Sequence, residues 1–122
     1  MTRLLIVDDE EAITSMLRLI FQMERWSVEV ANSVTEARQI LARRPFDLVI
    51  TDMRIDDPQS GVAVARSAKE AKPPAAVIIL SAFPMSREQW TACGADAFVL
   101  KGYAGMKELI HTAKRVVGNL AA

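Results

Sequence analysis

The sequence alternates between short apolar runs and segments in which apolar residues recur with helical spacing. Between the first two runs, for example, apolar side chains stand at Ile13, Leu17 and Ile20, which is typical of one face of an amphipathic helix. Each apolar run has the length of a strand and is followed by such a segment. The pattern predicts strands over residues 4–7, 27–31, 48–51, 76–80 and 98–100.

Several helix boundaries are marked by residues that cap or interrupt a helix. Ser33 and Ser86 each stand three residues before a glutamate or glutamine, which is the spacing of a capping box, and Ser60 is a candidate N-cap. Pro45 and the pair 73–74 are expected to end the second and third helices, because a residue that precedes proline disfavours helical backbone. The helices are therefore predicted to fill the intervals between the strands.

Strict alternation of strands and helices indicates a parallel sheet with helices on both faces. The first, third and fourth runs are continuously apolar, as central strands are, whereas residues 27–31 include a charged side chain, which suits an edge strand. We predict an α/β fold with a single doubly wound five-stranded parallel sheet, flavodoxin-like (βα)5, in the strand order 2-1-3-4-5. Residues 1–122 show no repeat or linker, so we expect one domain without an output domain.

Composition narrows the class of protein. With 51% hydrophobic and 25% charged residues in 122, the chain is neither disordered nor a linker. Its 15 basic and 15 acidic residues cancel, which argues against direct nucleic-acid binding. One cysteine cannot form an internal disulfide, no apolar run approaches the ~18 residues that span a bilayer, and the N-terminus does not resemble a signal peptide. We expect a cytoplasmic domain without membrane contact.

Polar residues follow four of the predicted strands. Asp8 and Asp9 follow the first, Asp52 the third, Ser81 the fourth and Lys101 the fifth. Ligands of a doubly wound sheet bind at the carboxyl ends of its strands, near the point where the strand order reverses, so these side chains are expected to gather at one edge. Acids after a strand can also serve only as N-caps of the next helix. That alternative suits Asp8 or Asp9 better than Asp52 or Lys101, neither of which directly precedes a predicted helix.

Three neighbouring carboxylates require a cation. At ~4 Å and an effective dielectric constant near 20, each like-charged pair costs on the order of 4 kcal/mol. Mg²⁺ suits such a site because it takes carboxylate oxygens, waters and a phosphate oxygen. The chain has no glycine-rich phosphate loop, so the site is not a nucleotide pocket of that kind. A carboxylate beside the metal can itself attack phosphorus and form an acyl phosphate.

Together with Ala82, these residues resemble the response-regulator receiver domain of two-component signalling, and the resemblance covers the whole chain. It implies that Asp52 accepts a phosphoryl group from a phosphohistidine of a sensor histidine kinase or a phosphotransfer protein, in a reaction that depends on Mg²⁺. Phosphorylation and dephosphorylation would be catalysed by the domain itself, without turnover of a separate substrate.

The resemblance also implies the ligands of Mg²⁺. The side chains of Asp9 and Asp52 and the backbone carbonyl of Met53 would bind the metal directly, and Asp8 would bind it through water. Glu10 and Glu11 are instead expected to complement the dipole of the first helix, and Asp56 and Asp57 to be solvent-facing loop acids.

The phosphoryl group would be held by a second set of groups. The hydroxyl of Ser81 and the ammonium of Lys101 would contact its oxygens, together with the backbone N–H groups of Arg54 and Ala82. Ser81 and Phe98 would then act as the switch that alters the surface of the fourth helix, fifth strand and fifth helix. A downstream protein target, whose identity the sequence does not give, would bind that surface, and a homodimer is compatible with the family. Two interpretations of the Arg54 side chain stay open: it tunes the hydrolysis of the acyl phosphate, or it is an ordinary solvated arginine.

The chain departs from the family pattern in three places. Gly102 follows the site lysine where the family usually has proline. The interval from Asp52 to Gly61 is one residue longer than usual, with its proline at Pro58. Between Ser81 and the lysine the chain is about two residues shorter, which predicts a truncated fourth helix.

Two other functions are consistent with an acidic α/β edge. One is a receiver-like interaction module that works without phosphorylation. The other is a Mg²⁺-dependent phosphatase of the haloacid-dehalogenase type, which also uses an aspartate nucleophile. That family carries an Asp-x-Asp motif after its first strand, whereas Asp8 and Asp9 are adjacent and the candidate acceptor follows the third strand.

Overall fold

The computed structural model describes the backbone of residues 1–121 and the side chains of residues 1–102 and 105–118. The strands are β1 (Arg3–Val7), β2 (Ser27–Ala31), β3 (Leu48–Asp52), β4 (Ala76–Ser81) and β5 (Ala97–Leu100). The helices are α1 (Glu11–Met23), α2 (Val34–Arg43), α3 (Ser60–Glu70), α4 (Arg87–Ala92) and α5 (Tyr103–Ala121). Strands and helices alternate along the chain as the hydrophobic pattern predicts.

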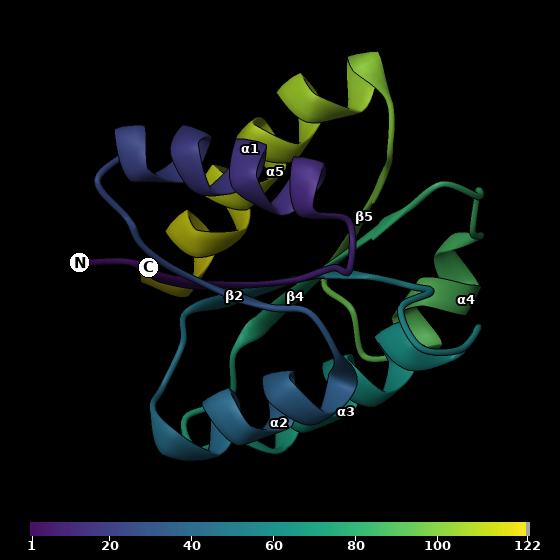
Figure 1. Ribbon diagram of the computed structural model, residues 1–122, viewed down its shortest axis with the longest axis horizontal. Helices are drawn as coiled ribbons and strands as arrows, with labels where there is room; N and C mark the ends of the chain where they lie inside the picture. The colour runs from purple at the N-terminus through teal and green to yellow at the C-terminus, as the bar shows by residue number, and fades with distance from the viewer. Residues whose placement is uncertain (122) are drawn as a thin grey trace.

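The strands form one parallel sheet in the order β2-β1-β3-β4-β5, which confirms the predicted flavodoxin-like topology. In Figure 1 the sheet is seen edge-on, with α1 and α5 above it and α2 and α3 below it. β2 lies at the edge and is only partly buried, whereas every residue of β3 and β4 is buried. The strand order therefore follows the degree of burial that the sequence indicates.

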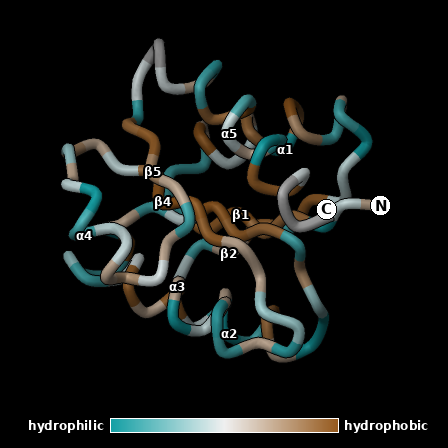
Figure 2. The backbone as a smooth tube through the Cα atoms, turned by 180° about the vertical axis from the view of Figure 1, so that it is seen from behind, coloured by the Kyte–Doolittle hydropathy of each residue, from teal (hydrophilic) through white to brown (hydrophobic). Residues whose placement is uncertain are grey.

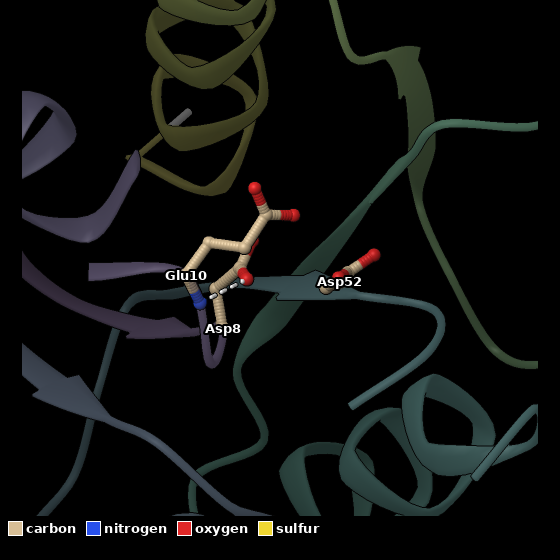
Figure 3. Close-up of side chains that lie close together, drawn as sticks. All are labelled: Asp8, Glu10 and Asp52. Carbon is tan, nitrogen blue, oxygen red and sulfur yellow. Dashed lines mark hydrogen bonds between the residues drawn. The ribbon is translucent and has the colours of Figure 1, made fainter. Parts of the chain in front are cut away.

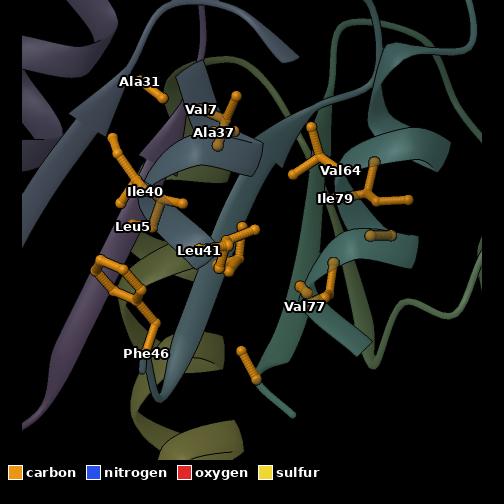
Figure 4. Close-up of a cluster of buried hydrophobic side chains, with 14 of the residues drawn as sticks. Leu5, Val7, Ala31, Ala37, Ile40, Leu41, Phe46, Val64, Val77 and Ile79 are labelled. Carbon is orange, nitrogen blue, oxygen red and sulfur yellow. The ribbon is translucent and has the colours of Figure 1, made fainter. Parts of the chain in front are cut away.

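Two apolar layers cover the two faces of the sheet because successive strand residues point to opposite sides. Leu5 and Val7 of β1 pack in the layer under α2 and α3, which Figure 4 shows. Leu4 and Ile6 pack in the layer under α1 and α5. Burying each such side chain contributes about 1.5–3 kcal/mol. In Figure 2 the hydrophobic colour accordingly concentrates in the central strands.

The predicted helix caps at Ser33 and Ser86 differ in detail. At α4 the capping box is complete, since the Ser86 and Gln89 side chains each accept a backbone N–H of the other residue. At α2 the Ser33 hydroxyl accepts the N–H of Glu36, but the Glu36 carboxylate accepts the N–H of Asn32 instead. The box predicted at Ser33 is therefore only half formed. α4 is short, as predicted.

Ser60 is not the N-cap of α3, contrary to the sequence-based prediction. It is the first helical residue, and Gln59 occupies the cap position. The buried Ser60 hydroxyl accepts the N–H groups of Asp56 and Asp57, at 3.0 and 2.9 Å. Its role is to accept hydrogen bonds from N–H groups of the loop between β3 and α3, because buried backbone N–H groups require partners.

Among the described residues, no helix combines the length and the apolar character that crossing a membrane requires.

Candidate functional site

The carboxyl ends of the strands bring together residues that are far apart in the sequence. Asp8 directly follows β1, Asp52 ends β3, Ser81 ends β4 and Lys101 directly follows β5. The Lys101 N–H donates to the Ser81 carbonyl at 2.8 Å, which fixes the end of β5 beside β4. The convergence expected at one edge of the sheet is therefore present for Asp8, Asp52, Ser81 and Lys101.

The ammonium of Lys101 lies at the centre of this edge. Its Nζ is 3.0 Å from Asp52 Oδ2, 3.1 Å from Asp8 Oδ2 and 3.0 Å from Glu10 Oε1. Burial alone would lower the pKa of Lys101, but the hydrogen bonds to Glu10 and Asp52 and the negative charge of Asp8 outweigh that effect and raise the pKa. Lys101 is consequently charged at neutral pH and holds the three acids together.

Asp8 is almost completely buried, with 1% of its surface exposed. Its Oδ1 accepts the N–H of Glu10 at 3.0 Å, whereas its buried Oδ2 has no hydrogen-bond partner of suitable geometry among the described residues. Burial raises the pKa of Asp8, although the hydrogen bond from Glu10 and the charge of Lys101 oppose this shift. Oδ2 is thus an acceptor whose capacity is not fully used.

This arrangement fits a hard divalent cation. Carboxylate oxygens of Asp8, Glu10 and Asp52 lie within 4.8 Å of one another, and Figure 3 shows the three side chains at the same edge. Three carboxylates and one ammonium leave an excess of negative charge. Mg²⁺ is bound through one or two carboxylates with several waters, so the incompletely satisfied oxygen of Asp8 suits it. The residues present could therefore hold Mg²⁺.

The acids after β1 are arranged differently from the sequence-based expectation. Glu10, which we assigned only to the helix dipole, reaches Lys101 and belongs to the acidic group. Asp9 is exposed and lines a hollow of about 640 Å³ with Glu11, Ser15 and other residues of α1 and its surroundings. The interpretation of Glu10 was too narrow, because its longer side chain turns back over the strand end. Metal binding by Asp9 stays a prediction.

The loop after β3 depends on a close approach of α3. The Met53 carbonyl accepts the N–H of Gly61 at 2.9 Å. A Cβ atom on Gly61 would lie 2.8 Å from Met53 Cα and 3.0 Å from the Asp52 carbonyl oxygen, so a larger residue would displace the loop. A carbonyl oxygen has a second lone pair, which leaves the Met53 oxygen able to bind a cation as well. The sequence gives Gly61 only as the end of this loop and does not indicate the close approach.

A cation–π contact joins the loop that follows β3 to the loop that follows β4. The Arg54 guanidinium carbon lies 4.8 Å from the centre of the Phe83 ring. The Phe83 N–H donates to Ser81 Oγ at 3.1 Å, which leaves the hydroxyl hydrogen of Ser81 free to donate elsewhere. Sequence patterning gave no signal for Phe83, because it is an isolated aromatic in a loop. Beneath the contact, Met53 and Ser81 help line a hollow of about 390 Å³.

The remaining predicted residues also have defined positions. Ala82 is exposed next to Ser81, and Phe98 is partly buried in the apolar layer that covers the α2–α3 face. Asp56 and Asp57 are exposed, as predicted, and accept loop or helix N–H groups.

Gly102, which departs from the family pattern, has a φ angle of 138°. Proline holds φ near −65°, so it could not adopt this backbone. The glycine therefore matches the local turn by which the chain passes from Lys101 into α5.

Comparisons with known proteins agree with this geometry. A family model described as the response regulator receiver domain matches residues 4–114. The response regulator protein PilR of Pseudomonas aeruginosa is 34% identical over 116 residues, which is 92% of this chain but 26% of PilR. This chain thus spans about a quarter of that relative. The transcriptional regulatory protein TrcR of Mycobacterium tuberculosis is 29% identical over 110 residues, 88% of this chain and 42% of TrcR.

Solved structures give the same assignment. The response regulator TrrA of Thermotoga maritima, in complex with Mg²⁺-BeF, is 29% identical with a TM-score of 0.82, and the match covers 95% of this chain and 99% of TrrA. TrrA in complex with the histidine kinase ThkA superposes with a TM-score of 0.79 at 28% identity, covering 95% and 98% of the two chains. We conclude from the topology, the acidic edge and these matches that the chain belongs to the response regulator receiver domain family of two-component systems.

Proposed function

We propose that Asp52 accepts a phosphoryl group from the phosphohistidine of a sensor histidine kinase or phosphotransfer protein, with Mg²⁺ as cofactor. The observation that carries this proposal is the group of Asp8, Glu10 and Asp52 around Lys101, in which the buried Oδ2 of Asp8 pairs with the ammonium but accepts no hydrogen bond from the described residues. Such a group serves no evident purpose in packing the sheet. It supplies both a cation site and a nucleophilic carboxylate at a strand end.

In the proposed reaction a carboxylate oxygen of Asp52 attacks phosphorus. The bond from phosphorus to the imidazole nitrogen breaks, and the imidazole keeps the electron pair while an acyl phosphate forms on Asp52. Lys101, already 3.0 Å from Asp52, would hold one phosphoryl oxygen, and the Ser81 hydroxyl and the N–H groups of Arg54 and Ala82 would donate to others. When bound, Mg²⁺ would neutralise charge on the transferred group.

We propose the ligands Asp9, Asp52 and the Met53 carbonyl for the metal, with Asp8 acting through water. The structure adds Glu10 as a further candidate, because its carboxylate already belongs to the acidic group. Hydrolysis of the acyl phosphate would likewise be catalysed by the domain itself. The contact between Arg54 and the Phe83 ring supports a role for both in restricting access of water to Asp52.

We propose that phosphorylation switches the surface formed by α4, β5 and α5. The added phosphoryl charge would draw the Ser81 hydroxyl inward, and Phe98 would move towards the space beside β4. Leu100 at the end of β5 is 43% exposed and would be available to a downstream protein. The chain itself would contact a protein target there rather than nucleic acid or a membrane.

The kinase or phosphotransfer protein must approach the edge that holds Asp52, where α1 begins. Three large apolar side chains on α1 are exposed, namely Met16, Leu19 and Met23. Because they lie on the helix that starts beside the acidic group, we assign this face to the phosphodonor protein.

The single cysteine is free, which supports a reducing compartment such as the cytoplasm.

Labelling with radioactive acetyl phosphate tests the proposal. We expect the protein to become labelled. The label should be labile to base and hydroxylamine, should require Mg²⁺ and should be absent from Asp52→Asn. Asp57→Asn, which removes an exposed acid of the neighbouring loop, is the matched control and should label normally. Equal labelling of Asp52→Asn and the control, or labelling in the presence of chelator, would contradict the proposal. Sustained turnover of a phosphate ester would instead favour a phosphatase.

A further inference from the structure

A groove lies between α2 and α3, on the side of the molecule away from the acidic edge. Helices of βα units run back against the strand direction, so the last turns of α2 and α3 lie at the amino ends of the strands, opposite Asp52. Two adjoining hollows of about 390 and 300 Å³ share Leu41, Ala42 and Ala71. Leu41 is 8% exposed and belongs to the apolar layer beneath, so the floor of the groove is aliphatic.

The walls of this groove are strongly basic although the whole chain has no net charge. The segments 38–44 and 66–72 carry one carboxylate, Glu70, against six cations. The cations are Arg38, Arg43, Arg44, Arg66, Lys69 and Lys72, and all of them except Lys69 line the groove. Arg44 pairs with Glu29 at 3.2 Å and Lys69 with Asp96 at 2.6 Å. Within the part of the chain that the structure describes, the other four cations form no salt bridge.

The helix dipole explains only part of this charge. Cations are favourable in the last turn of a helix, where Arg43 and Lys69 stand. Arg38 and Arg66 lie before those turns, one on each helix, and both line the groove. The Arg38 side chain is directed across the groove, because its Nε donates to Ser67 Oγ of α3 at 3.2 Å. Arg38 and Arg66 therefore add positive charge to the groove beyond the cations that the helix dipoles account for.

We propose that this groove binds an acidic segment of a partner protein, with an aliphatic side chain over Leu41 and carboxylates beside Arg38, Arg66 and Lys72. Charge complementarity favours an acidic ligand. A single-stranded nucleic acid is disfavoured, because the described residues that line the groove include no aromatic side chain on which bases could stack. A membrane is disfavoured because the exposed large apolar side chains of the described structure lie elsewhere. This function is independent of phosphoryl transfer at Asp52.

Binding of a synthetic peptide to the full chain tests the proposal. The probe is a fluorescein-labelled peptide of alternating glutamate and leucine, followed by anisotropy and by amide chemical shifts. We expect saturable binding that shifts residues 38–44 and 66–72 and weakens between about 50 and 300 mM salt, because exposed charges are then screened. The double variant Arg66→Glu/Lys72→Glu should bind about tenfold more weakly. Arg87→Glu/Lys107→Glu makes the same change in charge on α4 and α5 and should stay within about twofold.

Several other outcomes would overturn the proposed peptide, its site or its class. A peptide in which glycine replaces leucine should bind several-fold more weakly. Equal binding of the two peptides would overturn the proposed aliphatic contact with Leu41. Absence of saturable binding, or equal weakening by the two double variants, would overturn the groove as the site. Tighter binding of oligouridylate or of anionic phosphatidylglycerol vesicles would overturn the choice of a protein partner. Both double variants should retain the wild-type Tm and labelling by acetyl phosphate, so failure here is separable from failure at Asp52.

Discussion

The ammonium of Lys101 lies 3.0 Å from Asp52 Oδ2, across 49 positions of sequence. The same ammonium contacts Asp8 and Glu10, so one cation holds three acids at the end of the central strands. One positive charge does not neutralise three negative charges. Stability, metal binding and phosphoryl chemistry are therefore coupled through this group, and each can be tested by changing one residue.

Asp52→Asn should stabilise the protein in the presence of chelator. The variant loses the attraction to Lys101 but also the repulsion from Asp8 and Glu10, and at an effective dielectric constant near 20 the repulsions removed exceed the attraction by about 1 kcal/mol. We expect Tm to rise by about 4 °C. Glu108→Gln, an exposed acid on α5, is the control and should leave Tm unchanged. A lower Tm for Asp52→Asn would show that the acids do not repel one another in the native state.

Lys101→Met should have the opposite effect, because it leaves Asp8 and Asp52 buried without their cation. Breaking a buried ion pair in this way costs about 3 kcal/mol. Added Mg²⁺ should restore much of that loss, so the rise of Tm with Mg²⁺ should be larger in the variant than in the wild type. Lys107→Met removes an exposed lysine and serves for comparison. A variant whose Tm does not respond to Mg²⁺ would place the metal elsewhere.

Gly61→Ala should weaken Mg²⁺ binding. The new methyl group would meet Met53 Cα at 2.8 Å, so the loop that carries the Met53 carbonyl must shift. We expect the Kd for Mg²⁺, measured by calorimetry, to rise several-fold, with a loss of stability of about 1–3 kcal/mol. Gly118→Ala on α5 has open space around it and should be neutral or stabilising by up to about 1 kcal/mol. Unchanged Mg²⁺ affinity in Gly61→Ala would exclude the Met53 carbonyl as a ligand.

Cys93 should react slowly with alkylating reagents at neutral pH. Burial raises the pKa of the Cys93 thiol above its ordinary value of 9.0, and the thiolate is the reactive form. The rate of alkylation by iodoacetamide should therefore increase with pH to a midpoint above 9.0 in the native protein. In urea the midpoint should return to the ordinary value. A native midpoint below 9.0 would mean that a positive charge, and not burial, dominates the surroundings of the thiol.

The fold could be predicted from the sequence because burial on both faces leaves a direct signal. Strands such as 48–50 are continuously apolar, whereas the edge strand carries Glu29, and this difference indicates the strand order. The convergence of Asp8, Asp52 and Lys101 was predictable for a related reason, since parallel strands end at the same edge of the sheet. Both inferences depend on local pattern combined with topology.

The details that were missed depend on contacts that no local pattern records. Glu10 joins the acidic group through the direction of its side chain, which the sequence does not specify. Gly61 is required by a close approach to Met53, and Ser60 satisfies loop N–H groups rather than capping α3. The stacking of Arg54 on Phe83 likewise joins two loops that pattern analysis treats separately.

Reductive trapping of the phosphorylated residue tests the central claim most directly. Borohydride reduces an aspartyl phosphate to homoserine, so treatment after incubation with acetyl phosphate and Mg²⁺ marks the acceptor for peptide mass spectrometry. We expect homoserine at position 52 alone, and none when chelator replaces Mg²⁺. Homoserine at Asp9, Asp56 or Asp57, or equal amounts with and without Mg²⁺, would contradict this expectation.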